Sequence, residues 1–436
     1  MRECSKLTFL QTTSGRESIQ HRIQPISCKR KTKYQFNAGY LTTLSKTTFV
    51  ILSFVLTVIF AESCSRIPAR STIYGYHKPQ ANNDGIVTDE LNNVGIDSTL
   101  IIKLTKLILA DSIANVHSLL IVKDGKLVYE NYFAGNDQKH GKNLGYIENS
   151  MHQLHDCRSI SKSIVSACIG IAIQKGMISN VNDPVSKYLT EIKDSVKGTI
   201  TIQHLLTMTS GLEWKEIGSY GSFFNSETQM GLRFNPVKYI LRKTVATTPG
   251  SRLNYSAGNT QLLAEIIYRI SGLRVHEFAR KHLFYPLGIR NHEWVSLFLK
   301  KTPAAASGLR LTSRDVMKFG LLYMNDGNYN NTQVMDSAWV KESFQSFVQR
   351  PDLRDLKIKE GGYGYSFWTY TDTIQSRPIE IIEAKGNGGQ SIFFCKSLNL
   401  LVVTTGGNYN KPNDDPYRML TKHIIPAVAS RNSLIH

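Results

Sequence analysis

Cysteine is scarce in the part of the chain that is expected to fold. Six cysteines occur in 436 residues, and only Cys157, Cys168 and Cys395 lie after residue 64. The sequence contains no C-x-x-C pair. Three scattered cysteines form neither a disulfide framework nor a zinc-binding pattern, so we expect buried free thiols.

Several other signals are missing. The sequence has no G-x-S-x-G and no H-E-x-x-H, which excludes the α/β-hydrolase nucleophile elbow and the zincin metal site. It carries 52 Lys and Arg against 34 Asp and Glu, a formal net charge of +18, but no basic run of five or more residues. Because this charge is scattered among acids, we expect no nucleic-acid partner.

A long hydrophobic run is also absent. The apolar stretch over residues 48–61 is shorter than the about 20 residues of a membrane span and has the length of a signal-peptide core. Residues 1–63 carry nine basic side chains against three acids, which places the N-terminus in the cytoplasm and the rest outside. Cys64 resembles the lipidation site of a bacterial lipoprotein; an uncleaved anchor and a misassigned start codon are the alternatives. We expect an exported periplasmic or cell-surface protein, membrane-anchored at this end.

Residues 65–89 read as a polar connector and residues 90–436 as one domain. The stretch "SLLIVKDGKLVYENYF" alternates apolar and polar residues on both sides of Asp124-Gly125, which predicts a tight hairpin. Helical periodicity then dominates as far as about residue 340.

Strand patterns return near the C-terminal end, in "GYGYSFWTY", "IEIIEAKG" and "SIFFCKSLNLLVVTTG", before a last helix over residues 415–428. We therefore predict an α/β fold of the α+β type. An antiparallel sheet is assembled from both ends of the domain and flanked by helices, with a large helical insertion at about residues 177–340.

The segment "RSISKSIVSACIGIAIQKGMI" is the first candidate for chemistry. It is apolar nearly all round, which predicts a buried helix ending at Gly176 and a buried Lys162. Ser159 lies on the same helix face, three residues earlier. A hydroxyl, an amine that removes its proton and a dry environment that lowers the pKa of the amine make an S-x-x-K nucleophile. An N-cap serine with a snorkelling lysine explains the motif alone equally well.

Two further segments are candidates for chemistry only in combination with the S-x-x-K segment. Tyr255 ends an extended stretch before a helix expected over residues 260–270, and a phenol is a useful proton carrier only beside a cation such as Lys162. Alone, it reads as a half-buried aromatic residue. The glycine-rich segment "EAKGNGGQSIFF" interrupts two strand patterns, where a backbone N–H could pair with that of Ser159 in an oxyanion hole. A turn or β-bulge is the alternative.

Together, the order and spacing of these motifs resemble the serine hydrolase superfamily of class C β-lactamases and penicillin-recognising peptidases, over roughly residues 118–408. The stretches "LHDCRSISKS" and "AKGNGGQSIFF" look closest to its esterases and 6-aminohexanoate-oligomer hydrolases. The resemblance implies that Ser159 is the nucleophile, Lys162 its base and Tyr255 the proton relay. It places the oxyanion between the backbone N–H groups of Ser159 and Gln390, and requires no cofactor and no metal.

Two departures from the family concern the substrate. Penicillin-recognising members carry a cation and a hydroxyl where we place Asn387, Gly388 and Gly389, and an asparagine where this chain has Ala257. A register with Lys385 as the cation is the alternative.

We expect a small-molecule ester or amide without a β-lactam-type carboxylate. A β-lactamase, a D-Ala-D-Ala carboxypeptidase and an inactive cell-wall-binding relative are the rivals. His152 and His155 are expected to be structural.

Overall fold

The computed structural model describes residues 74–216, 222–297, 302–349, 360–411 and 415–432. The predicted leader, with Cys64, lies outside these ranges, so export and lipidation stay predictions. Within the described ranges, no helix combines the length and the apolar character that crossing a membrane requires.

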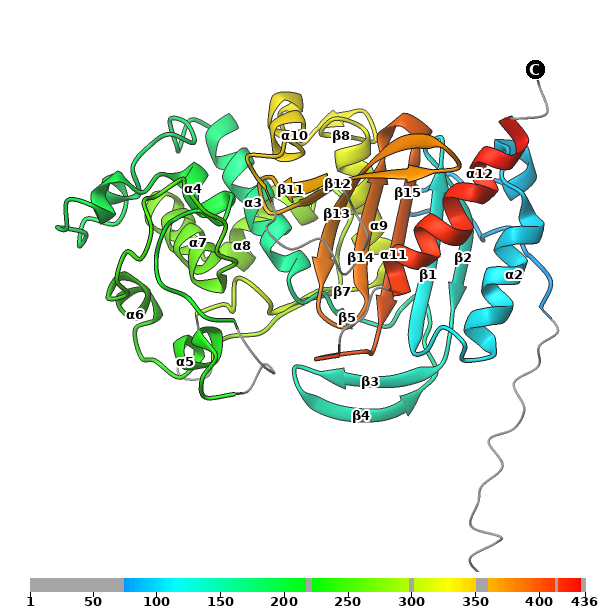
Figure 1. Cartoon of the computed structure of the whole chain (residues 1–436), viewed down its shortest axis with the longest axis horizontal. Helices are drawn as coiled ribbons and strands as arrows, with labels where there is room; N and C mark the ends of the chain where they lie inside the picture. The colour runs from blue at the N-terminus through cyan, green and yellow to red at the C-terminus, as the bar shows by residue number, and fades with distance from the viewer. Residues whose placement is uncertain (1–73, 217–221, 298–301, 350–359, 412–414, 433–436) are drawn as a thin grey trace, which may run out of the picture. The chain divides into compact units, whose positions relative to one another are not determined.

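An eight-stranded antiparallel sheet forms the centre of the domain, in the order β10-β11-β12-β13-β14-β15-β1-β2 (Figure 1). Its strands are β1 (Val116–Lys123), β2 (Lys126–Tyr132), β10 (Val348–Gln349), β11 (Glu360–Tyr363), β12 (Trp368–Ile374), β13 (Arg377–Gly386), β14 (Gln390–Cys395) and β15 (Leu400–Gly406). Because β1 pairs with β15, the sheet joins the two ends of the domain as the sequence predicted. The predicted hairpin is confirmed, with φ of 52° at Asp124 and 76° at Gly125.

Helices cover both faces of this sheet. On one face lie α2 (Ser98–Leu109) and the C-terminal helices α11 (Asp415–Met419) and α12 (Ile425–Asn432), which a π-helical turn, Leu420–Ile424, joins (Figure 1). The other face packs against the helical part of the chain. Its helices are α3 (Ile160–Gln174), α4 (Ile202–Leu206), α5 (Ser226–Gly231), α6 (Pro236–Leu241), α7 (Ala257–Ser271), α8 (Val275–Ala279), α9 (Ser313–Met324) and α10 (Ser337–Ser343).

Short strands outside the central sheet lie before and within the helical part. They form two-stranded and three-stranded sheets built from β3 (Gly135–Lys139), β4 (Lys142–Ile147), β5 (His155–Asp156), β6 (Glu293–Trp294), β7 (Leu309–Leu311), β8 (Asn328–Tyr329) and β9 (Thr332–Gln333). β5 leads directly into the start of α3, and β5 pairs with β7. The residues just before the predicted nucleophile are therefore held in a small sheet of their own.

Two boundaries differ from the prediction. The described part of the predicted connector packs on the sheet, since the Tyr76 hydroxyl donates to the carbonyl of Val128 at 2.9 Å and the Asp89 N–H to that of Leu127 at 3.1 Å. The helix expected from residue 260 begins at Ala257, because the Ser256 side chain caps it by accepting from the N–H of Asn259. Both differences come from hydrogen bonds, to the sheet in one case and from a capping side chain in the other, that hydrophobic periodicity does not reveal.

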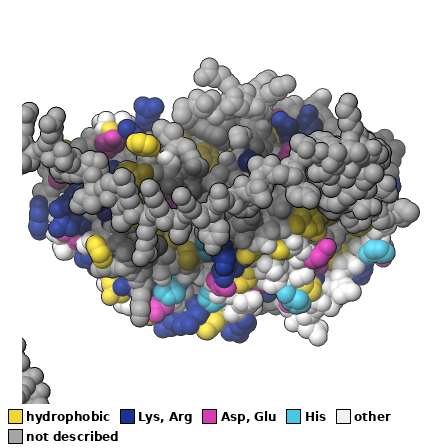
Figure 2. Space-filling view, turned by 90° about the horizontal axis from the view of Figure 1, so that it is seen from below, with side chains coloured by type: hydrophobic (Ala, Val, Ile, Leu, Met, Phe, Trp, Pro, Cys, Tyr) yellow, Lys and Arg dark blue, Asp and Glu magenta, His cyan; other side chains and the backbone are white. Residues whose placement is uncertain are grey.

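The surface mixes charges of both signs. On the face seen in Figure 2, Lys and Arg side chains lie interspersed with acidic, histidine and hydrophobic side chains of the described residues.

Helix α3 is buried over nearly its whole length, since every residue from Ile160 to Ala172 is buried. A methyl group at Gly170 would lie 2.6 Å from ring atoms of Trp339. The absence of a side chain at Gly170 thus lets the indole pack directly on the helix backbone.

We predict that Gly170→Ala lowers the free energy of unfolding by about 1–3 kcal/mol, because the overpacking of Trp339 outweighs the gain in helix propensity. Thermal and urea unfolding measure the change. Gly231→Ala, at the end of α5 with nothing within 4 Å of the added methyl, is the matched control and is expected to be neutral or stabilising. An equal response of the two variants would contradict the packing argument.

Candidate active site

Ser159 lies at the N-terminal end of α3, where its hydroxyl faces an amine. It occupies the N-cap position, yet its side chain makes no capping hydrogen bond and its backbone is already helical, with φ −67° and ψ −9°. The hydroxyl Oγ instead accepts a hydrogen bond from Nζ of Lys162 at 3.0 Å. Of the two interpretations of S-x-x-K, the structure favours the nucleophile over the helix cap.

The amine of Lys162 is held inside the protein. Lys162 is only 1% exposed, and Nζ also donates to the carbonyl of Ala306 at 3.2 Å. The same nitrogen lies 4.7 Å from the centre of the Tyr255 ring. A buried amine is costly unless polar groups surround it, and these contacts fix its position beside Ser159.

Tyr255 completes the predicted trio. Its side chain hydrogen-bonds to Ser159, and its ring stacks on Trp368 at 5.7 Å between centres. Burial raises the pKa of the hydroxyl well above its usual value, the negative charge of Glu216 raises it further, and the hydrogen bond to Ser159 opposes both. The phenol is therefore protonated at neutral pH and available as a proton donor.

Glu216 is a site residue that sequence reasoning missed. Its Oε1 accepts from the indole N–H of Trp214 at 2.8 Å and from the backbone N–H of Ala257 at 2.5 Å. Burial raises the pKa of this carboxyl to about 7, which the positive charge of Lys162 opposes. In "SGLEWKE" the sequence has no feature that separates this acid from Glu213, whose side chain is exposed.

Glu227 is the second missed carboxylate. Its Oε1 accepts from the hydroxyl of Ser307 at 2.6 Å, and its charge contributes to the raised pKa of Glu216. It lines a cavity of about 170 Å³ together with Arg158, Ser159, Thr228, Ser307 and Asn387. On this side, Ser159 thus faces a polar wall that carries one carboxylate, Glu227, and one guanidinium, Arg158.

A second cavity, of about 240 Å³, opens on the other side of Ser159. It is lined by Ser159, Tyr255, Trp368, Lys385, Gly386, Asn387, Gly388, Gly389, Ser391, Lys411 and Pro416. Two lysines therefore reach this wall, and the expectation of a wall without a cation is corrected. The Nζ of Lys385 also lies 3.9 Å from a carboxylate oxygen of Glu383.

The glycine-rich segment is a turn. β13 ends at Gly386, and Asn387, Gly388 and Gly389 connect it to β14. The two glycines have φ of +105° and +97°, and a methyl group at Gly388 would lie 2.5 Å from the Tyr409 ring. The strand end near Ser159 is instead Lys385-Gly386, where a methyl group on Gly386 would lie 2.4 Å from the carbonyl of Cys157. Both Lys385 and Asn387 line the cavity beside Ser159, so the two predicted registers remain alternatives.

Three predicted contact residues have other roles. The Gln390 side chain turns to β15 and donates from Nε2 to the carbonyl of Gly406 at 2.5 Å, whereas the oxyanion role expected of its backbone N–H stays a prediction. The Asn387 side chain donates to Asn410 at 2.9 Å, although the residue lines both cavities. Ala257 is buried, lines neither cavity and presents its N–H to Glu216.

The remaining predictions concern histidines and cysteines. His152 is exposed whereas His155 is buried, so the two histidines of H-x-x-H lie in different environments. Burial lowers the pKa of His155 to about 3, which keeps the ring neutral. The cysteines at 157, 168 and 395 are buried free thiols, as expected.

Comparison with known proteins matches residues 115–421 to the Beta-lactamase family. The chain is 24% identical over 226 residues to the 6-aminohexanoate-dimer hydrolase of Paenarthrobacter ureafaciens, which covers 49% of this chain and 57% of that relative. The fold resembles EstCE1, a hydrolase with promiscuous acyltransferase activity, with a TM-score of 0.60, 16% identity, and coverage of 76% and 98%. It also resembles a class C β-lactamase with a TM-score of 0.56, 16% identity, and coverage of 75% and 95%.

We predict that Glu216→Gln moves the rise of kcat/KM with pH to lower pH. Above its pKa of about 7 the Glu216 carboxylate is ionised and favours the protonated form of Lys162, whereas activation of Ser159 needs the neutral amine. Removing that negative charge should therefore shift the rise downward by about one pH unit or more.

Profiles of kcat/KM from pH 5 to 10 with an ester substrate measure this shift. Glu213→Gln is the matched control, because Glu213 is exposed in the same segment, and its profile should follow the wild type. Superimposable profiles for the wild type and Glu216→Gln would show that the Glu216 charge does not act on the reaction.

Proposed function

The chain belongs to the Beta-lactamase family, and on that premise we propose that it hydrolyses an ester or amide bond of a small molecule through an acyl-enzyme on Ser159. The observation that carries this proposal is the 3.0 Å hydrogen bond between Nζ of Lys162 and Oγ of Ser159, in the wall of two cavities. A buried amine in contact with a serine hydroxyl is the arrangement that turns the hydroxyl into a nucleophile.

The chemistry follows from the positions of the side chains. Oγ of Ser159 attacks the carbonyl carbon while its proton passes to Lys162, and a bond from Oγ to the acyl carbon forms. We infer that the backbone N–H of Ser159 and one from the segment Asn387 to Gln390 stabilise the oxyanion; Ser159 and Asn387 line the same cavity, which supports this. The leaving group takes a proton through the Tyr255 hydroxyl, and water then releases the acyl group.

The walls of the site support a polar substrate. Lys385 and Lys411 line one cavity beside Ser159, and Glu227 with Arg158 lines the other. Complementary charge orients a bound molecule, so these walls suit an ester or linear amide with polar groups on both sides of the scissile bond. The named activities of the 6-aminohexanoate-dimer hydrolase and of EstCE1 are in keeping with such a substrate.

A β-lactamase or D-Ala-D-Ala carboxypeptidase is the second candidate. The observation that favours it is the pair Lys385 and Lys411 beside Ser159, because a cation in this place can bind a substrate carboxylate. The asparagine that the family uses for the substrate amide is still replaced by Ala257, which is turned to Glu216. This second feature favours the ester or linear amide.

One substrate panel tests the proposal and separates the candidates. A short p-nitrophenyl ester, a linear zwitterionic amide and a chromogenic cephalosporin are compared by kcat/KM. We expect the ester or the linear amide to exceed the cephalosporin by at least tenfold. Lys162→Met should lower every measurable rate by about 10²–10⁴-fold, because it removes the proton acceptor.

Lys175→Met, at the exposed C-terminal end of the same helix, is the control and should leave all rates unchanged. Faster turnover of the cephalosporin would replace the first candidate by the second. Rates that survive Lys162→Met would contradict both candidates.

A further inference from the structure

Three buried side chains that the catalytic reaction does not use converge behind the nucleophile. His117 lies on β1, Asp137 on β3 and His155 on β5, and they are 0%, 3% and 1% exposed. Each offers one nitrogen or oxygen atom, and these three atoms all lie within 4.8 Å of one another. Two imidazoles and a carboxylate are among the preferred protein ligands of zinc.

The carboxylate in this group has no cationic side chain to neutralise it. Among the described residues, no Lys or Arg lies within 4.0 Å of Asp137; the ionisable neighbour is His117, at 3.9 Å between Nδ1 and Oδ1. The nearby guanidinium groups of Arg158 and Arg310 pair with Asp156 instead, at 3.0 and 2.8 Å. Buried charges in proteins are paired or coordinate metals, so Asp137 calls for a cation that the side chains do not supply.

Several polar atoms of the group also have no hydrogen-bond partner. These atoms are Nδ1 of His117, Oδ2 of Asp137 and both ring nitrogens of His155. Burying a polar atom without a partner costs free energy, and three adjacent residues with this defect indicate that a further group sits between them.

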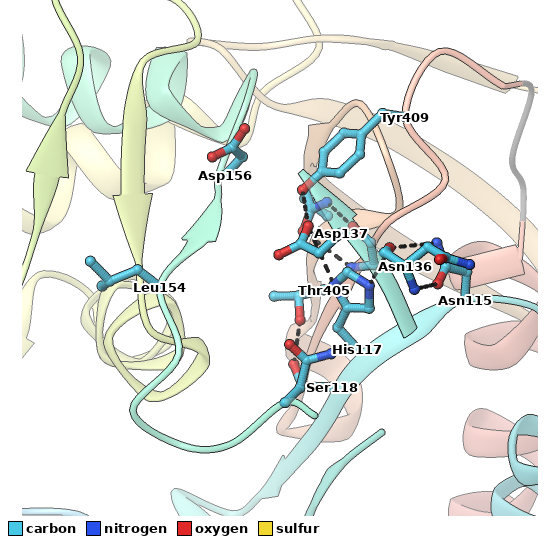
Figure 3. A network of polar contacts seen from close by, with 12 residues as sticks. Asn115, His117, Ser118, Asn136, Asp137, Leu154, Asp156, Thr405 and Tyr409 are labelled. Atoms are coloured by element: carbon cyan, nitrogen blue, oxygen red, sulfur yellow. Dashed lines mark hydrogen bonds and ion pairs between the residues drawn. The ribbon is translucent and has the colours of Figure 1, made fainter. Parts of the chain in front are cut away.

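The surrounding hydrogen bonds orient the lone pairs inward. The Nε2 of His117 lies 3.0 Å from the carbonyl of Asn136, which leaves Nδ1 facing Asp137. The Asp137 carboxylate accepts at Oδ1 from the Tyr409 hydroxyl at 3.2 Å and lies between that hydroxyl and the His117 ring (Figure 3). Imidazole ligands of metals usually donate their other N–H to a carbonyl, and ligating carboxylates are hydrogen-bonded in turn.

We propose that His117, Asp137 and His155 bind one divalent zinc-class metal ion in a buried structural site. The sequence led us to expect no metal, because the three ligands are far apart along the chain and only the fold brings them together. Bonds of about 2.0–2.2 Å to zinc require ligand atoms about 3.4 Å apart, so the group closes by about 1 Å on binding. A water molecule or a backbone carbonyl supplies the fourth ligand.

The position of this site gives it a structural role next to the reaction. The ion would tie β1, β3 and the segment before α3 together. Tyr409, which donates to Asp137, packs its ring against Gly388 and lies 4.8 Å from the guanidinium of Arg158. Gly388 and Arg158 belong to the two segments that flank Ser159. Both therefore pack against Tyr409, whose hydroxyl is held by the metal ligand Asp137.

Metal content and stability of the full-length chain test the site. The protein is purified with an affinity tag that lacks histidine, without chelator, and analysed by inductively coupled plasma mass spectrometry. We expect about one zinc per chain, and after chelation and reloading with Co²⁺ a visible absorption band of a tetrahedral site. Chelation should lower Tm by about 5 °C, and Zn²⁺ should restore it.

Asp137→Asn keeps the shape and the acceptor for Tyr409 but removes the charge, so it should lose the metal and the response of Tm to chelator. His152→Gln, in the exposed histidine three residues before His155, is the matched control and should keep both. Wild-type protein without bound metal, with a Tm that neither chelator nor Zn²⁺ changes, would overturn the proposal and leave a buried polar cluster. This outcome is independent of whether Ser159 forms an acyl-enzyme.

Discussion

The contact between the buried Lys162 amine and the Ser159 hydroxyl is the constraint on which the rest of the site depends. A lysine that is 1% exposed in the first turn of a helix has to be surrounded by polar atoms and π-electrons, and the structure provides them from Ala306 and Tyr255. Along the chain, Ala306 lies nearly 150 residues after Lys162, and Tyr255 lies nearly 100 residues after it. Satisfying one buried amine therefore brings together Ser159 and Tyr255, the proposed nucleophile and proton carrier.

The fold meets this requirement by packing α3 against both the sheet and the neighbouring helices α7 and α8. Its residues from Ile160 to Ala172 are buried, so the helix cannot turn to expose Lys162. Its first turn starts from β5, whose pairing with β7 sets the backbone before Ser159. The turn after β13 packs against the backbone that precedes Ser159. It does so through Gly386, and through Gly388, which packs on the Tyr409 ring.

Much of the fold could be predicted from the sequence, but less of the site. Alternation around Asp124-Gly125 and the three C-terminal strand patterns predicted the sheet, because strand periodicity reflects burial directly. S-x-x-K predicted a contact within a single helical turn, which local geometry dictates. The backbone N–H of Gln390 as an oxyanion partner stays a prediction, because the contacts of its side chain with β15 do not test the position of the backbone donor. Sequence reasoning missed the two carboxylates, Glu216 and Glu227. It also missed the grouping of His117 with Asp137 and His155, because only the tertiary fold makes these side chains neighbours.

The central claim is that Ser159 is the residue that carries the acyl group, and intact mass spectrometry tests it most directly. Wild-type protein is mixed with a short activated ester, quenched with acid in the steady state and weighed, and the modified peptide is sequenced. The account predicts a mass increase equal to one acyl group, located on Ser159 and absent from Ser159→Ala. An adduct on another residue, or one of equal size in Ser159→Ala, would contradict it.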